Sequence, residues 1–174
     1  TASVTTVMAC RPAVMRLVDQ GGLQLDARVS SYLPEFQGDG KEAITVRQLL
    51  AHTSGLRPDV GLKPDWTGTE AAIELACAEK LRARPGEQFI YSDTGPILLG
   101  EVVRRVTGQP LDQFLAREIY GPLRMKDTGF NPPQAKLPRV APTEIENGQP
   151  VRGVVHDPRA RRMGGVAGHA GLFT

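Results

Sequence analysis

Residues 89–130, FIYSDTGPILLGEVVRRVTGQPLDQFLAREIYGPLRMKDTGF, carry the strongest structural pattern in the chain. Apolar residues recur at helical spacing behind a proline that suits a helix start, and Gly108 follows the last of them, which predicts a helix over 96–107. A second helix is expected over 110–120, so that the two form an αα-hairpin. The short aromatic and β-branched run 89–91 predicts a strand-like piece ahead of the hairpin.

The sequence before this hairpin predicts three further helices. One is expected over 12–20 and opens with a proline, which the first turn of a helix tolerates. If that helix begins instead near Ser3, the proline must kink it. The other two are expected over 46–52, behind Thr45 as N-cap, and over 69–81.

Helical periodicity fades after the hairpin. Residues 131–155 are rich in Pro, Asn and Gly and indicate loops with short strands. Residues 164–172, GGVAGHAGL, contain four glycines and predict a conformationally demanding turn. No internal repeat divides the chain, so one mainly α domain over 1–174 is expected.

Composition places the chain among ordinary globular proteins. Its 174 residues suffice for one core or slightly more, with 40% hydrophobic and 23% charged residues. The net charge of +2 gives no reason to expect a nucleic-acid partner. Arg159, Arg161 and Arg162 cluster in a loop-like stretch and are expected to be solvated surface. No run approaches the roughly 20 apolar residues that span a bilayer, and the opening residues lack the pattern of a signal peptide.

The two cysteines, Cys10 and Cys77, share no metal-binding or redox spacing. Two buried free thiols are expected in preference to a disulfide.

Two polar positions could carry chemistry. Tyr91 lies between the strand-like run and a helix, where its hydroxyl can face a cleft and act as a general base if an ammonium group lowers its pKa. The structural alternative is a packed tyrosine ring, with Asp93 capping the helix. Ser3 precedes a helical segment whose dipole would favour developing negative charge, but a nucleophilic serine also needs a base; the alternative is an N-terminal tail.

The histidines give weaker signals. His52 in LLAHTSGL is expected to be structural. His156, Asp157 and His169 leave open a metal-dependent hydrolase, although no two histidines have the spacing of a helical metal site. The chain has no G-x-S-x-G elbow and no phosphate-binding or dinucleotide loop.

Together, four blocks in this order resemble the serine β-lactamase-like family, which includes class C β-lactamases, penicillin-binding proteins and family VIII esterases. The blocks are AVMRLVDQGGLQLDARVSSYLPEF at 13–36, ITVRQLLAHTSGL at 44–56, the stretch 89–130, and GGVAGHAGLF at 164–173. They cover nearly the whole chain.

The resemblance implies a set of site residues. Ser3 matches the nucleophile of the family's S-x-x-K motif, and Thr6 stands at the position of its lysine. Tyr91 matches the base of the Tyr-x-Asn motif, with Asp93 in place of the amide. The letters HAG at 169–171 fit the third motif, His-x-Gly, but their surroundings are similar to the family's mid-chain glycine turn. Thr6 and Asp93 are therefore supporting positions, and no metal site is implied.

The resemblance also implies a fold and an activity. We expect the helical domain and connecting segments of the β-lactamase/transpeptidase-like α+β fold, with most of the β-sheet absent and the chain truncated. The implied reaction is acyl transfer to serine from a β-lactam, an ester or a peptidoglycan-like D-alanyl peptide. No cofactor is implied.

Because the motif lysine and the third motif are lacking, weak or no turnover is expected. The alternative is a non-catalytic helical remnant that self-associates as a homo-oligomer or binds a partner. A periplasmic or secreted location follows from the resemblance, and a cytoplasmic one stays open.

Overall fold

The computed structural model describes residues 2–174. Their regular structure is helical with only a few short strands, which agrees with the expected mainly α domain. The helices are α1 (Ala2–Thr5), α2 (Arg11–Asp19), α3 (Val46–Leu50), α4 (Thr69–Ala78), α5 (Thr94–Thr107), α6 (Leu111–Leu115) and α7 (Pro158–Arg162). Short 3₁₀ turns cover Val29–Ser31, Lys41–Ala43 and Gln134–Arg139, and π-helical turns cover Thr6–Cys10 and Ala116–Tyr120. The strands are β1 (Gly129–Phe130), β2 (Glu144–Glu146), β3 (Gln149–Val151) and β4 (Leu172–Phe173).

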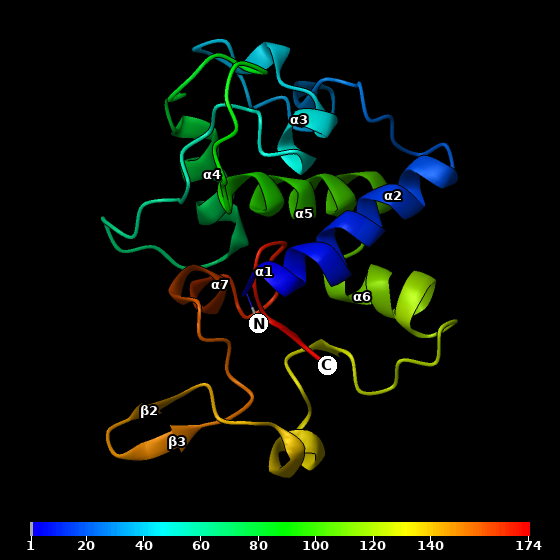
Figure 1. The fold of residues 1–174 in the computed structure, drawn as a ribbon, viewed down its shortest axis with the longest axis vertical. Coiled ribbons are helices and arrows are strands. Elements are labelled where there is room, and N and C mark those ends of the chain that lie inside the picture. The colour runs from blue at the N-terminus through cyan, green and yellow to red at the C-terminus, as the bar shows by residue number, and fades with distance from the viewer. Residues whose placement is uncertain (1) are drawn as a thin grey trace.

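The strands form two small antiparallel pairs. β1 pairs with β4, with Phe130 opposite Leu172. β2 and β3 form a hairpin that projects away from the helices (Figure 1). The β2–β3 hairpin confirms the expectation of loops with short strands over 131–155, and β1 and β4 lie outside that range.

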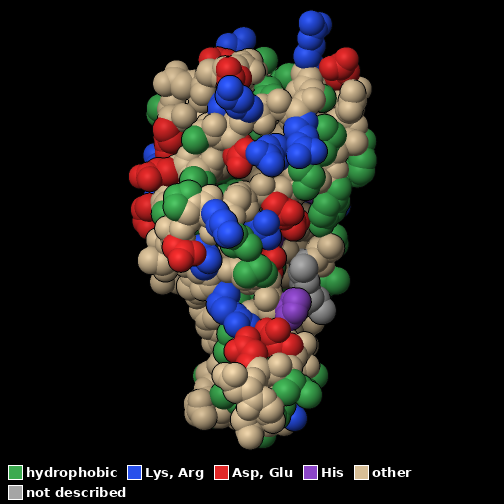
Figure 2. Space-filling model, turned by 90° about the vertical axis from the view of Figure 1, so that its left-hand side faces the viewer, with side chains coloured by type: hydrophobic (Ala, Val, Ile, Leu, Met, Phe, Trp, Pro, Cys, Tyr) green, Lys and Arg blue, Asp and Glu red, His purple; other side chains and the backbone are tan. Residues whose placement is uncertain are grey.

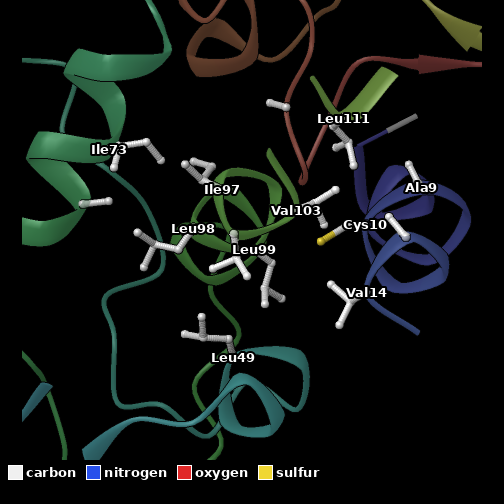
Figure 3. Close-up of a cluster of buried hydrophobic side chains, with 14 of the residues drawn as sticks. Ala9, Cys10, Val14, Leu49, Ile73, Ile97, Leu98, Leu99, Val103 and Leu111 are labelled. Atoms are coloured by element: carbon white, nitrogen blue, oxygen red, sulfur yellow. The ribbon is translucent and has the colours of Figure 1, made fainter. Parts of the chain in front are cut away.

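Helix α5 lies at the centre of the helical part, and α2, α3, α4 and α6 pack against it (Figure 1). Its apolar side chains meet Leu49 of α3 and Val14 of α2 in one cluster (Figure 3). The fully or nearly fully buried apolar residues of α5 are Ile97, Leu98, Leu99, Val102 and Val103. Each contributes about 1.5–3 kcal/mol of hydrophobic stabilisation, so the helix predicted from this run also organises the core.

The N-terminal helix begins near Ser3 rather than at Pro12. Residues 2–19 are helical throughout, and the Thr6–Cys10 π turn lies directly ahead of α2. Pro12 has no N–H to donate to the carbonyl of Met8; the Tyr120 hydroxyl donates to that oxygen instead, at 2.9 Å. The proline is thus accommodated by a π turn and a side chain distant in sequence, and burial raises the pKa of Tyr120 to about 12.

Several predicted boundaries were wrong. Helix α5 starts two residues before Pro96, at Thr94, and α3 ends at Leu50 because His52 adopts a left-handed backbone with φ +57°. Helix α4 ends at Ala78 instead of 81. Buried Lys41 donates to the carbonyls of Cys77 (2.7 Å) and Glu79 (3.0 Å), which satisfies the end of this helix.

Two predicted local structures were also wrong. Residues 89–91 form no strand, because the backbone N–H of Ile90 donates to the carbonyl of His52 at 2.9 Å and so takes no part in a sheet. Arg159, Arg161 and Arg162, predicted to lie in a loop, belong to helix α7 and form ion pairs with acidic side chains. Arg161 contacts Glu144 and Glu146, and Arg162 contacts Asp65.

The glycine-rich turn at 164–172 packs against both the N-terminal helix and α5. A Cβ on Gly168 would lie 2.0 Å from the carbonyl oxygen of Pro96 and 3.4 Å from the Cys10 sulfur, so only glycine fits there. Four residues later, the Leu172 N–H donates to Thr5 Oγ1 at 3.2 Å. The turn therefore sets the separation of the two helices.

Both thiols are buried and free, as predicted, and burial raises the pKa of Cys10 to about 12 and that of Cys77 to about 11. Among residues 2–174, no helix is long and apolar enough to cross a membrane. Basic and acidic side chains alternate over the face shown in Figure 2. On that face the charge is mixed, in keeping with the small net charge.

Candidate active site around Ser3 and Tyr91

The structure brings Ser3 and Tyr91 into contact. Ser3 Oγ and the Tyr91 hydroxyl oxygen are 3.0 Å apart, within hydrogen-bonding distance. Ser3 lies in the first turn of the N-terminal helix and is exposed, and Tyr91 is 43% exposed. A serine and a hydroxyl base in this geometry have the arrangement that nucleophilic catalysis requires.

A loop after α3 holds the segment that carries Tyr91. The Asp93 N–H donates to the carbonyl of Pro58 at 2.7 Å, and the Ser92 hydroxyl donates to the carbonyl of Arg57 at 2.6 Å. These bonds fix the backbone on the C-terminal side of Tyr91 immediately before α5 begins.

Thr6 lies one helical turn from Ser3, on the inner side of the helix. It is 5% exposed, and the described residues give its Oγ1 no hydrogen-bond partner. A threonine hydroxyl is neutral and cannot replace the ammonium group that the family motif places here. The position is close to Ser3, but it supplies no positive charge.

Asp93 occupies the N-cap position of α5 without making a side-chain cap hydrogen bond. Burial raises the pKa of its carboxyl group, and the carboxylates of Asp59 and Asp157 raise it further. His169 and the Tyr91 side chain act in the opposite direction. The Asp93 carboxylate thus lies in a partly buried cluster of polar side chains beside Tyr91. Burying a charged carboxylate costs free energy that burying a neutral amide at this position would not.

His52 is a neighbour of Tyr91 whose position the sequence does not reveal. Its ring lies 4.6 Å from the Tyr91 ring, centroid to centroid, and its Nδ1 accepts a 3.3 Å hydrogen bond from the Ser92 N–H. The LLAHTSGL motif draws attention to this residue, but the 39 positions between the two rings leave no spacing signal.

His156, Asp157 and His169 do not assemble as metal ligands. His169 is fully buried, and its Nε2 lies 2.9 Å from Asp157 Oδ1. His156 is exposed and lies 3.7 Å from Glu144 instead. No group of three potential ligands that could hold a metal ion occurs within residues 2–174. The letters HAG at 169–171 lie in the turn before β4 and not on a strand.

Comparison with known proteins agrees with this architecture. The chain is 38% identical to the N-acetylmuramyl-L-alanine amidase of Bacillus subtilis (strain 168) over 202 aligned residues. The alignment covers 99% of this chain and 46% of that protein, so the chain spans about half the length of that relative.

Two solved structures share the fold. A penicillin-binding protein homologue from Caulobacter crescentus superposes with a TM-score of 0.71 at 29% identity, covering 92% of this chain and 43% of that one. The octameric penicillin-binding protein homologue from Pyrococcus abyssi gives 0.73 at 26% identity, covering 98% and 40%. The Beta-lactamase family model matches residues 1–174, and the chain belongs to that family.

Proposed function

We propose that this chain carries the nucleophile and base of a serine hydrolase, with Ser3 as the residue that is acylated and Tyr91 as the base that accepts its proton. The 3.0 Å separation of the two hydroxyl oxygens is the observation that supports this assignment. In this scheme the Tyr91 oxygen accepts the Ser3 proton while Oγ forms a bond to a carbonyl carbon. The C–N or C–O bond to the leaving group then breaks, and Tyr91 returns the proton to the departing amine or alcohol. Water finally cleaves the acyl-serine, which releases the carboxylic acid and restores Ser3. Thr6 and Asp93 are supporting positions, and the reaction needs no cofactor.

The substrate class follows from family membership and the names of relatives. The Bacillus subtilis relative is named an N-acetylmuramyl-L-alanine amidase, and the solved homologues are named penicillin-binding protein homologues. We therefore propose a β-lactam, an ester or a peptidoglycan-like D-alanyl peptide as the acyl donor.

We further propose that residues 1–174 are one partial domain, the helical portion and connecting segments of an α+β fold whose main sheet is not among them. None of the four described strands carries a Lys-Thr-Gly or His-x-Gly sequence. A distant strand of that kind supplies one of the two N–H donors to the oxyanion, and losing one such donor costs about 10²–10³ in rate. With Thr6 also in place of a lysine, weak or no turnover is expected from residues 1–174 alone.

Covalent labelling tests the proposal directly. The folded chain is incubated with a fluorophosphonate and, separately, with a β-lactam, and intact mass is measured against time. We expect slow formation of one adduct per chain, located on Ser3 by peptide mapping and missing from Ser3→Ala. Ser31→Ala, which removes a hydroxyl outside the site, serves as the matched control and should label like the parent. A folded chain that forms no adduct with either reagent contradicts the proposed chemistry.

One surface feature favours a second function, self-association. Val4, Val7 and Met15 are 42%, 55% and 41% exposed and lie near one side of the N-terminal helix. Apolar side chains gathered on a helix face are commonly covered by association. We propose a homo-oligomer through this face, whether or not the site is active. Sedimentation velocity tests it: Val7→Glu should shift the chain toward monomer, and a parent chain monomeric at high concentration contradicts it.

A further inference from the structure

His52 contacts three consecutive residues around Tyr91. Its carbonyl oxygen accepts from the Ile90 N–H at 2.9 Å. Its ring faces the Tyr91 ring at 4.6 Å, with an angle of 31° between the planes. Its Nδ1 accepts from the Ser92 N–H at 3.3 Å. Backbone and side chain of one residue thus hold the segment on both sides of Tyr91.

The backbone of His52 is itself unusual. Its φ of +57° places it in the left-handed region, which non-glycine residues seldom occupy. Such a conformation persists where surrounding contacts over-determine it, and it is often found at functional sites. The side chain is 5% exposed and packs edge-on against the Phe89 ring at 5.9 Å, so its orientation is fixed from a second side.

The hydrogen bond to Ser92 also defines the protonation state of His52. An N–H donor faces Nδ1, so this nitrogen must carry a lone pair and the proton must reside on Nε2. Burial lowers the pKa of His52, and the Arg11 guanidinium lowers it further. The neutral ring is therefore favoured at neutral pH, where the bond to Ser92 is intact.

We propose that His52 is a positioning residue for the Ser3–Tyr91 pair: its neutral ring and Nδ1 hold residues 90–92 so that the Tyr91 hydroxyl stays within hydrogen-bonding distance of Ser3. The catalytic meaning of this role rests on the proposed function, while the positioning itself does not. The contacts that carry this role join His52 to residues 89–92, so it acts through Tyr91.

Two substitutions separate the contributions of His52. In His52→Asn, the side-chain oxygen takes the place of Nδ1 as acceptor, and asparagine tolerates a positive φ. In His52→Phe, an aromatic ring remains but the acceptor is lost, and the buried Ser92 N–H is left unpaired. His156→Asn, at an exposed histidine, is the matched control.

The first readout is amide hydrogen exchange at Ser92, followed by NMR and expressed as a protection factor. We expect His52→Phe to lower protection at Ser92 by about tenfold or more, as the loss of a buried acceptor implies, while His52→Asn stays near the parent. In the parent, protection at Ser92 should be lost only at a pH well below the ordinary histidine pKa of 6.5, because the pKa of His52 is lowered and a protonated Nδ1 cannot accept. In His52→Asn this loss in acid should vanish. A general loss of stability would not remove a pH dependence at one amide.

The second readout is the rate of fluorophosphonate labelling at Ser3. We expect a loss of about tenfold or more in His52→Phe, a smaller loss in His52→Asn, and none in His156→Asn. Unchanged Ser92 protection and labelling in both His52 variants would overturn the positioning role while leaving the proposed function intact. If the parent never labels but the exchange pattern holds, the proposed function fails and the positioning role stands. If His52→Phe does not fold, the pH profile of His52→Asn decides.

Discussion

The hydroxyl oxygen of Tyr91 lies 3.0 Å from Ser3 Oγ, and 88 sequence positions separate the two residues. Ser3 is carried by the first turn of the N-terminal helix, and Tyr91 by the segment before the central helix α5. Their contact depends on how these helices dock, so substitutions at the hydroxyl pair and at the docking contacts should have distinguishable effects.

Replacement of Tyr91 by phenylalanine should slow Ser3 labelling by about 10²-fold or more, because a positioned base contributes about 10²–10⁴ in rate. The ring and its packing against His52 are kept, so thermal stability should change little. Tyr32→Phe is the matched control, since its hydroxyl accepts from the Gln24 N–H at 3.3 Å, far from Ser3 in sequence. Labelling by Tyr91→Phe at the parent rate would exclude Tyr91 as the base.

Thr6→Lys should restore little activity. The substitution places an ammonium group one helical turn from Ser3, but it does not supply a second oxyanion donor, whose absence costs about 10²–10³ in rate. We therefore expect the labelling rate to rise by less than about tenfold, which is far less than the rate lost with the missing oxyanion donor. The measurement is the labelling rate of Thr6→Lys beside Thr6→Met, which has similar length and no charge. A gain of several hundredfold would show that the lysine alone limits the site.

Two neighbouring threonines should respond in opposite directions to replacement by valine. Thr6 Oγ1 is buried with no hydrogen-bond partner in the described residues, so Thr6→Val should raise the free energy of unfolding by about 1 kcal/mol. Thr5 Oγ1 accepts from the Leu172 N–H, so Thr5→Val should lower it by about 1 kcal/mol. Urea unfolding of the two variants measures both values. Destabilisation by Thr6→Val would reveal a partner for that hydroxyl.

Gly168→Ala should destabilise the fold by about 1–3 kcal/mol, as overpacking of a close contact does. The added methyl group would lie 2.0 Å from the Pro96 carbonyl oxygen and would push the turn away from α5. Gly129→Ala is the control, because nothing lies within 4 Å of a Cβ there, and should change stability by less than about 0.5 kcal/mol. Thermal unfolding compares the two; equal melting temperatures would mean that the turn adapts.

Asp157 should make stability depend on acid pH. Burial alone would raise its pKa, but hydrogen bonds from His169 and from the backbone of α7 lower it from 3.8 to about 2. A lowered carboxyl pKa stabilises the fold above the unfolded value of 3.8, and this stabilisation is lost as pH falls from there toward 2. Allowing for solvent screening, about 1 kcal/mol is involved.

Asp157→Asn should therefore flatten the curve of unfolding free energy against pH between about 4 and 2, where the parent loses its carboxylate contribution. Urea unfolding at several pH values gives the curve. Asp19→Asn, at an exposed carboxylate, should follow the parent. An unchanged slope in Asp157→Asn would mean that its contacts do not discriminate between the charged and neutral forms.

The sequence by itself determined the parts of this protein that depend on near neighbours in the chain. The apolar period of α5 and Gly108 at its end predicted the central helix and its buried face, and Thr45 with Gln48 forms the capping box at the start of α3. The ordered motif blocks also indicated the family. Periodicity, caps and turns act over a few residues, so they can be read without knowing the rest of the fold.

Only the tertiary structure decided how the site is assembled. The N-terminal helix continues through Pro12 because the Tyr120 hydroxyl, on another helical segment, donates a hydrogen bond to the Met8 carbonyl. The run 89–91 forms no strand, since the Ile90 N–H donates to the carbonyl of His52 after α3. Likewise, Asp157 pairs with His169 instead of contributing to a metal site. In each case a buried polar group must find a partner, and which partner it meets depends on packing between segments far apart in sequence.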